Sequence, residues 1–433
     1  MTAVFAYVKI TIIIRLRAVM IISHLSLTNF RNYGRLELDF PLGTTLLHGN
    51  NAQGKTNLLE AVYYLATSRS PHASHERQLL NWEATQADEP VIVGRLVAQV
   101  STQTGERHIE MRLIQERERN GYSGQSSFRR QALVDRRKVR LMDLLGNLRV
   151  VLFLPEDVQL LTGSPSGRRR YMDITLCQID SAYCRALSQY NKALEQRNVL
   201  LRQIGEGQGS LDVLPVFTDK LVSLGSQILG RRAAFLANIA REAQHIHYEA
   251  LTQGQETIRM RYLPRLPKDG NGRNSDTTDL EEAGEWLQAN YDDTPAIAAR
   301  LAQTLAEAQR NDLGRGATSV GPHRDDWALT INGRNLGSYG SRGQQRSAIL
   351  ALKLAEINWM ESLTGDKPIL LLDEVVAELD ERRRALLLNA VQQSTQALLT
   401  STDPGMFTSE FMAQTTSMTV ENGRVRPDRQ VEL

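Results

Sequence analysis

The sequence predicts an α/β protein in which a mixed sheet carries a phosphate-binding loop and a second lobe is helical. A G-x-x-x-x-G-K-[ST] segment stands at residues 49–56, between a short strand and an apolar helical pattern. Near the other end, the apolar run 369–372 leads into two carboxylates, as a strand buried on both faces of a parallel sheet does. Between them, over residues 168–248, the apolar period changes to that of helices.

The chain begins with an apolar segment, residues 1–19, that is broken by Lys9, Arg15 and Arg17. It is too short to span a membrane and has no small-residue cleavage site of the kind that ends a signal peptide. We expect translation to start naturally at Met20, or this extension to be peripheral.

The N-terminal part of the predicted head, residues 20–165, consists mainly of strands. Alternating apolar residues predict a hairpin, then the strand before the phosphate loop, then further strands of which some are antiparallel, and one buried strand. These strands are predicted at residues 25–30, 36–40, 44–48, 91–100, 109–114, 131–134 and 150–154.

The phosphate loop has the residue types that nucleotide binding needs. Its glycines let backbone N–H groups close on phosphates, and the following helix directs the positive end of its dipole at them. Lys55 would reach the β- and γ-phosphates, and the Thr56 hydroxyl would coordinate Mg²⁺. The predicted ATP-binding residues of this loop are Gly49, Asn50, Asn51, Ala52, Gln53, Gly54, Lys55 and Thr56.

The carboxylates that follow the apolar run, Asp373 and Glu374, supply the second half of such a site. Asp373 would hold Mg²⁺ together with Thr56, and Glu374 would be the catalytic residue that polarises the attacking water. An apolar run that ends in Asp-Glu is weak evidence alone. Beside a phosphate loop it is strong, because attack on the γ-phosphate needs a metal ligand and a water-positioning carboxylate at one mouth of the sheet.

Residues 166–299 are predicted to form the helical lobe, and residues 300–433 to return to the head. Two apolar stripes in the lobe are separated by the turn 205–210, so the two helices are expected to fold back as a hairpin. The polar, Gly- and Asn-rich segment 267–279 is predicted to be a mobile loop.

The distribution of charge gives a candidate DNA surface. The net charge of +2 argues neither for nor against nucleic acid, but residues 105–140 hold ten Arg and Lys against five acids, a local excess of +5. A solvated face of long side chains is the alternative interpretation, and residues 168–170, three consecutive arginines, are a second candidate. The tentative DNA contacts are Arg129, Arg130, Arg136, Arg137, Lys138 and Arg140.

The two cysteines, Cys177 and Cys184, have neither C-x-x-C spacing nor a secreted context, so we expect reduced thiols packed as small hydrophobic groups. No stretch reaches the roughly 18 consecutive apolar residues that a membrane helix needs. We therefore expect a cytoplasmic protein without a membrane partner.

Residues 341–346, which precede a helical stretch, resemble the signature sequence of ABC-type ATPases, and residues 377–380 resemble their D-loop. In that superfamily the signature serine and glycine approach the γ-phosphate bound to the partner subunit. The resemblance implies that Ser341, Gly343 and Gln344 complete the partner's site, so that two chains enclose two ATP molecules.

From Ile21 almost to its end the chain resembles the RecF family of bacterial DNA replication and repair proteins. The phosphate loop is shared by very many families, whereas the Pro-His-Arg-Asp-Asp and Arg-Asn segments are much narrower signals. The matching motifs stand at residues 29–33, 54–60, 153–157, 163–165, 168–170, 196–198, 321–326, 332–333 and 343–346.

The RecF resemblance implies an ABC/SMC-like ATPase head with a compact helical lobe. It implies dimerisation on ATP and DNA binding near single-strand/double-strand junctions, such as those of gapped duplex. It also implies that the protein acts with RecO and RecR to help RecA displace single-strand-binding protein, and that slow ATP turnover resets the clamp. ATP and Mg²⁺ are the implied cofactors.

Several departures from the family pattern bear on the site. Ala52 replaces a glycine common in the loop, which should stiffen it slightly without abolishing binding. Pro71 interrupts the usual basic pattern, so no base contact is assigned there. The segment 400–403 lacks the switch histidine of ABC proteins, so we expect slow turnover, and no secure Q-loop glutamine follows residue 154.

Two other classes of protein fit part of the sequence. A generic ABC or SMC-type motor would need a transmembrane partner or long coiled-coil arms, and the interrupted helical segment here is too short for such arms. A nucleotide-gated scaffold or regulator without direct DNA binding would keep all three ATPase motifs. Only a measurement of DNA binding separates this second class from a DNA-binding ATPase.

Overall fold

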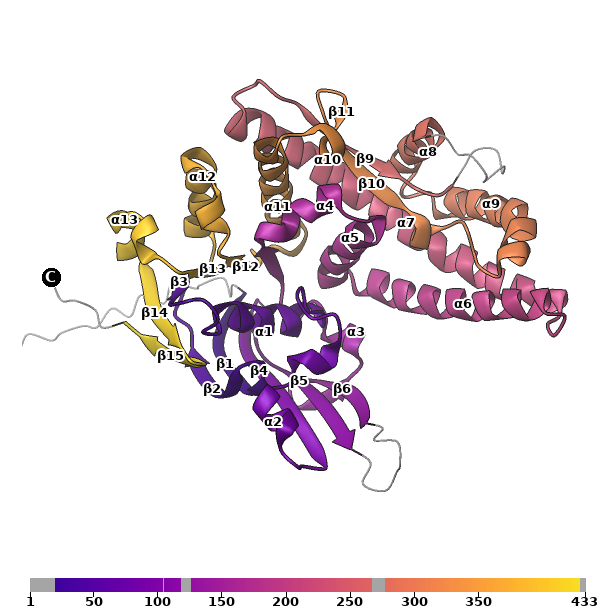
Figure 1. The fold of residues 1–433 in the computed structure, drawn as a ribbon. Helices are drawn as coiled ribbons and strands as arrows, with labels where there is room; N and C mark the ends of the chain where they lie inside the picture. The colour runs from indigo at the N-terminus through magenta and orange to yellow at the C-terminus, as the bar shows by residue number, and fades with distance from the viewer. Residues whose placement is uncertain (1–19, 104, 118–125, 267–276, 429–433) are drawn as a thin grey trace, which may run out of the picture.

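A computed structural model of the chain describes residues 20–103, 105–117, 126–266 and 277–428 (Figure 1). The predicted N-terminal extension, residues 1–19, lies outside the described residues. So do Arg119 of the basic segment and residues 267–276 of the predicted loop.

The centre of the molecule is a six-stranded sheet in which all neighbouring strands but one pair are parallel. Its strands, in spatial order, are β15 (Arg424–Pro427), β14 (Thr415–Glu421), β3 (Gly43–His48), β13 (Gln396–Ser401), β12 (Ile369–Asp373) and β8 (Val150–Phe153). Strands β12 and β13 are buried along their whole length. This burial on both faces explains why the sequence of β12 is continuously apolar.

Alternate side chains of the central sheet enter two different cores. Leu370 and Leu372 of β12 pack into a core that includes the helical lobe and α11 (Arg342–Thr364), whereas Ile369 and Leu371 enter a core that includes α1 (Lys55–Thr67). Helix α1 lies between this sheet and a second, antiparallel sheet (Figure 1). The phosphate loop that precedes α1 is therefore fixed by packing on both sides of the helix.

The antiparallel sheet contains the predicted N-terminal hairpin and the further predicted strands. Its spatial order is β2 (Tyr33–Asp39), β1 (Ile21–Phe30), β4 (Val91–Thr102), β5 (Gly105–Arg117), β6 (Ser126–Val134) and β7 (Arg137–Val139). The strands run longer than their apolar alternation predicted. A register shift between Ile22 and His24 changes the phase of β1.

The helical lobe contains the predicted hairpin, which is confirmed as α6 packed against α7. The five longer helices of this part are α5 (Pro165–Ile179), α6 (Ser181–Gly205), α7 (Leu214–His245), α8 (Thr277–Ala289) and α9 (Thr294–Arg315). Helices α6, α7 and α9 extend away from strands β14 and β15 (Figure 1). Helix α9 crosses the expected boundary at residues 299/300, and the division of the chain into domains stays a prediction.

A small antiparallel sheet joins the lobe to the segment that leads into α11, and the sequence did not predict it. It consists of β9 (Ile258–Leu263), β10 (Asp326–Ile331) and β11 (Arg334–Asn335). Trp327 of β10 is almost fully buried and packs near Tyr171 of α5. This sheet therefore fixes the start of the lobe to the chain that returns to the head.

The remaining elements are short, except α12. The α-helices among them are α2 (Trp82–Gln86), α3 (Leu141–Leu144), α4 (Gln159–Thr162), α10 (Leu336–Tyr339), α12 (Glu381–Gln393) and α13 (Ser409–Ala413). Single turns of 3₁₀ helix are η1 (Glu76–Leu79), η2 (Pro155–Val158), η3 (Leu211–Val213), η5 (Pro322–Arg324), η6 (Val375–Glu378) and η7 (Pro404–Met406), and η4 (Ile246–Leu251) is a π-helical turn. Among the described residues, none of these or the longer helices is both long and apolar enough to cross a bilayer.

Candidate nucleotide site and basic surfaces

The phosphate loop connects the end of β3 to the start of α1 through a backbone that only glycine adopts easily at its two framing positions. Gly49 has φ 145° and Gly54 has φ 117°. A Cβ on Gly49 would lie 2.4 Å from the Val420 carbonyl oxygen of β14, and one on Gly54 would lie 2.5 Å from Asn32 Nδ2. Gly49 is therefore required by close approach of a neighbouring backbone as well as by conformation, and Gly54 is required by conformation.

Ala52, the departure from the family loop, also has a left-handed backbone, with φ 64°. This conformation costs an alanine about 1 kcal/mol that it does not cost a glycine. The substitution therefore adds local strain to the loop, which the packing around it must offset.

Contacts from the first hairpin and from β14–β15 hold the loop in shape. Asn32 Nδ2 donates to the Gln53 carbonyl at 2.9 Å, and the Tyr33 hydroxyl donates to the Gly54 carbonyl at 2.8 Å. From the β14–β15 turn, Gly423 N donates to the Gln53 carbonyl at 3.1 Å and Asn422 N donates to Gln53 Oε1 at 2.8 Å. Sequence reasoning identified Asn32 and Tyr33 only as part of a family motif and missed Asn422 and Gly423.

Lys55 and Glu374, predicted to bind phosphate and to activate water, lie in contact. Lys55 Nζ is 3.1 Å from Glu374 Oε1, and it also donates to the carbonyls of Gly49 at 2.8 Å and Asn50 at 3.0 Å. The Lys55 side chain is only 4% exposed. These three partners match the three protons of the ammonium group.

Thr56 and Asp373, predicted to hold Mg²⁺, also lie together. Thr56 Oγ1 donates to Asp373 Oδ1 at 3.0 Å, and Thr400 Oγ1 of β13 donates to the same oxygen at 2.7 Å. Burial raises the pKa of Asp373, and the two hydroxyl hydrogen bonds oppose that rise. A hydroxyl and a carboxylate oxygen at one point are hard oxygen donors of the kind that Mg²⁺ takes, so the residues present fit this ion.

Strand register explains how Thr400 reaches this point, which sequence reasoning did not foresee. Asp373 at the end of β12 pairs with Thr400 of β13, and the Glu374 amide donates to Thr400 Oγ1 at 2.9 Å. Glu374 has φ 51°, a left-handed turn that redirects the chain as β12 ends. One hydroxyl thus contacts both the Asp373 carboxylate and the Glu374 backbone.

The signature residues lie at the N-terminus of α11. Ser341 caps the helix, since Ser341 Oγ accepts from Gln344 N at 3.2 Å, while Gln344 Oε1 accepts from Ser341 N at 2.8 Å. Gln344 Nε2 donates to Glu256 Oε1 at 2.7 Å, and the Gly343 carbonyl accepts from Arg383. Within the described residues, no hydrogen bond or ion pair joins this helix start to the phosphate loop of the same chain. Completion of the partner's site stays a prediction.

Half of the tentative DNA contacts on β6, β7 and the segment after them are already paired with acids. These three pairs are Arg129 with Glu116, Arg130 with Glu76, and Arg140 with Asp143. The other three side chains are exposed at and beyond the β6–β7 turn, namely Arg136, Arg137 and Lys138. Of the three acids, Glu76 and Asp143 lie outside the basic segment, so these pairs offset two charges of the local excess, and the exposed side chains at that turn keep theirs.

The second basic candidate is the three arginines at the start of α5, and each of them binds a different partner residue. Arg168 forms a two-pronged pair with Asp326, with distances of 2.6 and 2.8 Å. Arg169 donates to the Asp325 carbonyl at 2.6 Å and Arg170 to the Ser70 carbonyl at 2.7 Å. Of these three described side chains, Arg168 is the one that a carboxylate neutralises.

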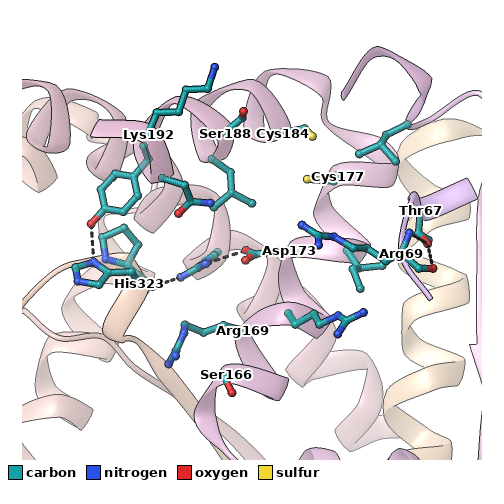
Figure 2. Close-up of a pocket in the computed structure, with 18 residues that line it drawn as sticks. Thr67, Arg69, Ser166, Arg169, Asp173, Cys177, Cys184, Ser188, Lys192 and His323 are labelled. Carbon is teal, nitrogen blue, oxygen red and sulfur yellow. Dashed lines mark hydrogen bonds and ion pairs between the residues drawn. The ribbon is translucent and has the colours of Figure 1, made fainter. Parts of the chain in front are cut away.

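The two cysteines are free and buried, as predicted, and they lie on the neighbouring helices α5 and α6. Both line a pocket between these helices and the segment after α1 (Figure 2).

Comparison with known proteins gives consistent results. Residues 21–426 match the family model of the RecF/RecN/SMC N terminal domain. The DNA replication and repair protein RecF of Chloroflexus aggregans is 39% identical over 411 residues, which cover 94% of this chain and 99% of that protein. The RecF of Roseiflexus castenholzii is 38% identical over 414 residues, with 94% and 100% covered. A solved structure of the recombination mediator protein RecF-ATPrS in the RecFOR pathway matches with a TM-score of 0.76 and 30% identity, covering 95% of this chain and 98% of that one.

Proposed function

This chain belongs to the RecF/RecN/SMC N-terminal domain family, in which its relatives are RecF proteins of DNA replication and repair, and from that membership we propose an ATP-dependent DNA-binding protein. It would dimerise on ATP at single-strand/double-strand junctions and, with RecO and RecR, help to load RecA at gaps. Slow ATP hydrolysis would release the dimer. The observation that carries the proposal is the meeting of Lys55 with Glu374 and of Thr56 with Asp373 at one mouth of the central sheet.

The arrangement of charged groups suggests how ATP binding would prepare hydrolysis. Lys55 would exchange Glu374 for the β- and γ-phosphate oxygens, because a triphosphate carries more negative charge than one carboxylate. Glu374, released from the ammonium, would then orient a water and accept its proton as the water oxygen bonds to the γ-phosphorus and the bond to ADP breaks. Thr56 and Asp373 would hold the Mg²⁺ that neutralises phosphate charge.

Dimerisation would supply the remaining side of the nucleotide. The Ser341 hydroxyl accepts a backbone hydrogen bond as the helix cap but keeps its own proton for an anion, and the amides of the first turn of α11 point outward with the positive end of the helix dipole. A γ-phosphate held by a second copy would meet these donors. Gln344 is bound to Glu256 in the present conformation and would have to leave it to contact that phosphate.

DNA binding is the part of the proposal that distinguishes it from a nucleotide-gated scaffold. A gel shift with gapped duplex, intact duplex and single strand, each with and without ATP and Mg²⁺, tests it directly. We expect retention of the gapped duplex only with nucleotide. A protein that dimerises on ATP and retains none of the three DNAs would be the scaffold instead. The pairing of Arg129, Arg130 and Arg140 with acids favours that alternative, and the exposed Arg136, Arg137 and Lys138 favour DNA binding.

A further inference from the structure

A further basic surface, which includes Arg169 of the second basic candidate, lies at the junction of α5, α9 and the segment before β10. A cavity of about 580 Å³ opens there, and the residues that line it include four arginines and three serines but no Asp or Glu among those described. They are Ser164, Pro165, Ser166, Arg169, Arg265, Arg315, Ala317, Ser319 and Arg324. The like charges of Arg169, Arg315 and Arg324 around one opening repel each other, so such a cavity favours an anion.

The fold fixes two of these arginines without neutralising them. Arg169 donates to the Asp325 carbonyl, and Arg324 donates to the Thr318 carbonyl at 3.2 and 3.3 Å. A carbonyl oxygen orients a guanidinium but removes none of its charge. The Asp325 carboxylate points to the interior instead, where it accepts from Tyr262 and lies 3.2 Å from Arg232.

The arginine cavity adjoins the pocket between α5, α6 and the end of α1. Ser166 and Arg169 line both, and the second space, about 550 Å³, adds Arg69, Arg170 and Lys192 (Figure 2). The acidic residue among its described lining, Asp173, is engaged by Arg232 at 2.8 Å and by the Tyr183 hydroxyl. We call the two adjoining spaces the arginine groove.

We propose that the arginine groove binds the phosphodiester backbone of DNA, an inference that rests on the DNA binding proposed above. Several separated cations along two adjoining cavities suit a run of phosphates better than a single anion. Guanidinium groups match phosphate oxygens with two parallel hydrogen bonds.

The aromatic lining of the groove argues for contact with the backbone rather than with bases. Among the described lining residues, the aromatic rings are those of Tyr190 and His323, and they are bound to each other, with Tyr190 OH 2.8 Å from His323 Nδ1. Tyr190 is only 2% exposed. Bases that stack on protein need open ring faces, which these two do not offer. The groove should therefore be indifferent to sequence.

Arginines of the groove also differ from the paired arginines of the first basic candidate in the groups that they bind. Arg129, Arg130 and Arg140 are paired with carboxylates, so phosphate would have to displace an existing partner there. In the groove, Arg169, Arg170 and Arg324 keep their full charge because their partners are carbonyls. The groove therefore binds phosphate at lower cost than these three paired arginines, whereas Arg136, Arg137 and Lys138 of the first candidate are exposed.

The test compares two double variants of the full-length protein in the presence of ATP. Arg315→Ala/Arg324→Ala removes two exposed cations of the groove, and Arg129→Ala/Arg140→Ala removes two exposed cations that are paired with acids. Binding of fluorescent gapped duplex is measured by anisotropy over a series of salt concentrations. Each lost phosphate contact should flatten the slope of log affinity against log salt by about one unit.

We expect the groove variant to lose at least about tenfold in affinity near physiological salt, with a slope flatter by up to about two units. The paired-arginine variant should stay close to the parent. If Arg324→Ala unfolds the protein, the double variant Arg69→Ala/Arg315→Ala is measured in its place, because it removes two exposed groove cations and leaves Arg324 intact. Parent affinity and parent slope in a folded groove variant would overturn the groove assignment while leaving the proposed function intact.

Two further measurements distinguish a backbone site from a protein without DNA binding and from a site for single phosphate groups. A parent protein that binds no DNA under any condition would refute the proposed function itself. Inorganic phosphate is then compared with chloride at equal ionic strength as a competitor of DNA. Equal competition by the two salts supports a backbone site, whereas stronger competition by phosphate in the parent and not in the groove variant would identify a site for single phosphate groups.

Discussion

Asp373 accepts hydrogen bonds from two threonines that arrive from different directions, Thr56 at the start of α1 and Thr400 on β13. Because both donate to the same oxygen, Oδ1, the carboxylate has one fixed orientation, and its neighbour Glu374 is turned by a left-handed backbone toward Lys55. The two acids, adjacent in sequence, therefore have different partners. This difference is the physical basis for assigning them different roles.

Glu374→Gln tests the proposed division of roles. Glutamine keeps the size of the side chain but cannot accept a proton from water, so ATP should still bind while hydrolysis nearly stops. The dimer should then accumulate, because hydrolysis is what dissolves it. Turnover is measured as phosphate release under saturating ATP, and a variant that hydrolyses ATP at the parent rate would show that Glu374 is not the base.

His323 gives a prediction about stability and pH. Its Nδ1 accepts from Tyr190 and its Nε2 donates to the Thr318 carbonyl, and burial lowers the pKa of His323 to about 4. Because this value lies below the ordinary 6.5, the unfolded chain binds the proton more readily, and stability falls as pH drops from about 6.5 toward 4. Over pH 7 to 5 the loss from this group should be about 2 kcal/mol.

The matched variant for this prediction is His323→Gln, which keeps one donor and one acceptor but does not titrate. Urea unfolding of parent and variant is compared at pH 7 and pH 5, so that the titration of all other groups cancels. The parent should lose more free energy of unfolding than the variant. An identical loss in both proteins would mean that His323 is not held neutral by the fold.

At the scale of elements, strand register and helix starts bring the nucleotide residues together. The parallel pairing of β3, β13 and β12 places three carboxyl ends at one edge, and the phosphate loop leaves from the first of them. Lys55, Thr56, Asp373 and Glu374 could be placed there from the sequence because the first two close the recognisable phosphate loop and the last two stand at the end of an apolar strand.

Other parts of the site could not be predicted in this way. Thr400 reaches Asp373 only through the register of β12 and β13, and Asn422 reaches Gln53 through a turn distant in the chain. The sheet of β9, β10 and β11 was missed because β9 shows its alternation over only six residues inside a region of helical period. The sequence offered Arg169 and Arg170 within the second candidate, but the other cations of the arginine groove were missed because they come from separate segments, whereas the charge run around β6 is contiguous and conspicuous.

The hairpin of α6 and α7 is tied to α9 by a buried ion pair. Arg197 NH1 lies 2.9 Å from Asp312 Oδ2, and the two side chains are 1% and 0% exposed. Arg197 also donates to Thr318 Oγ1 at 2.7 Å, and Asp312 Oδ1 accepts from the Ser319 hydroxyl at 2.6 Å. The pair thus fixes the segment that leads to Arg324 of the groove.

Asp312→Ala should therefore destabilise the lobe by about 3–5 kcal/mol, because it leaves a buried guanidinium without its counterion. Arg310→Ala, an exposed change on the same helix, is the control and should stay within about 0.5 kcal/mol of the parent. Unfolding in urea is followed by tryptophan fluorescence, since Trp286 and Trp327 belong to the core that includes the helical lobe. Equal stability of the two variants would contradict the importance assigned to this pair.

At the scale of the whole molecule, the central sheet separates two cores, and the two proposed activities lie on different parts of the same scaffold. The segment 68–73 runs between them. Its Ser70 carbonyl accepts from Arg170 of the groove, while the Ser70 hydroxyl bonds Glu60 of α1, the helix that begins at the phosphate loop. Occupation of the groove and the position of α1 are therefore connected through one residue.

The central claim is that ATP, held by one chain, brings two chains together. Sedimentation velocity measured with and without ATP and Mg²⁺ tests it most directly, with the parent, Lys55→Ala and Glu374→Gln compared at one protein concentration. Lys55→Ala removes the charge that would hold the β- and γ-phosphates, so this variant should remain monomeric with ATP. We expect the parent to shift from monomer to dimer only with ATP, and Glu374→Gln to shift more completely. A parent that stays monomeric with ATP, or a Lys55→Ala variant that dimerises on ATP as the parent does, would contradict the claim.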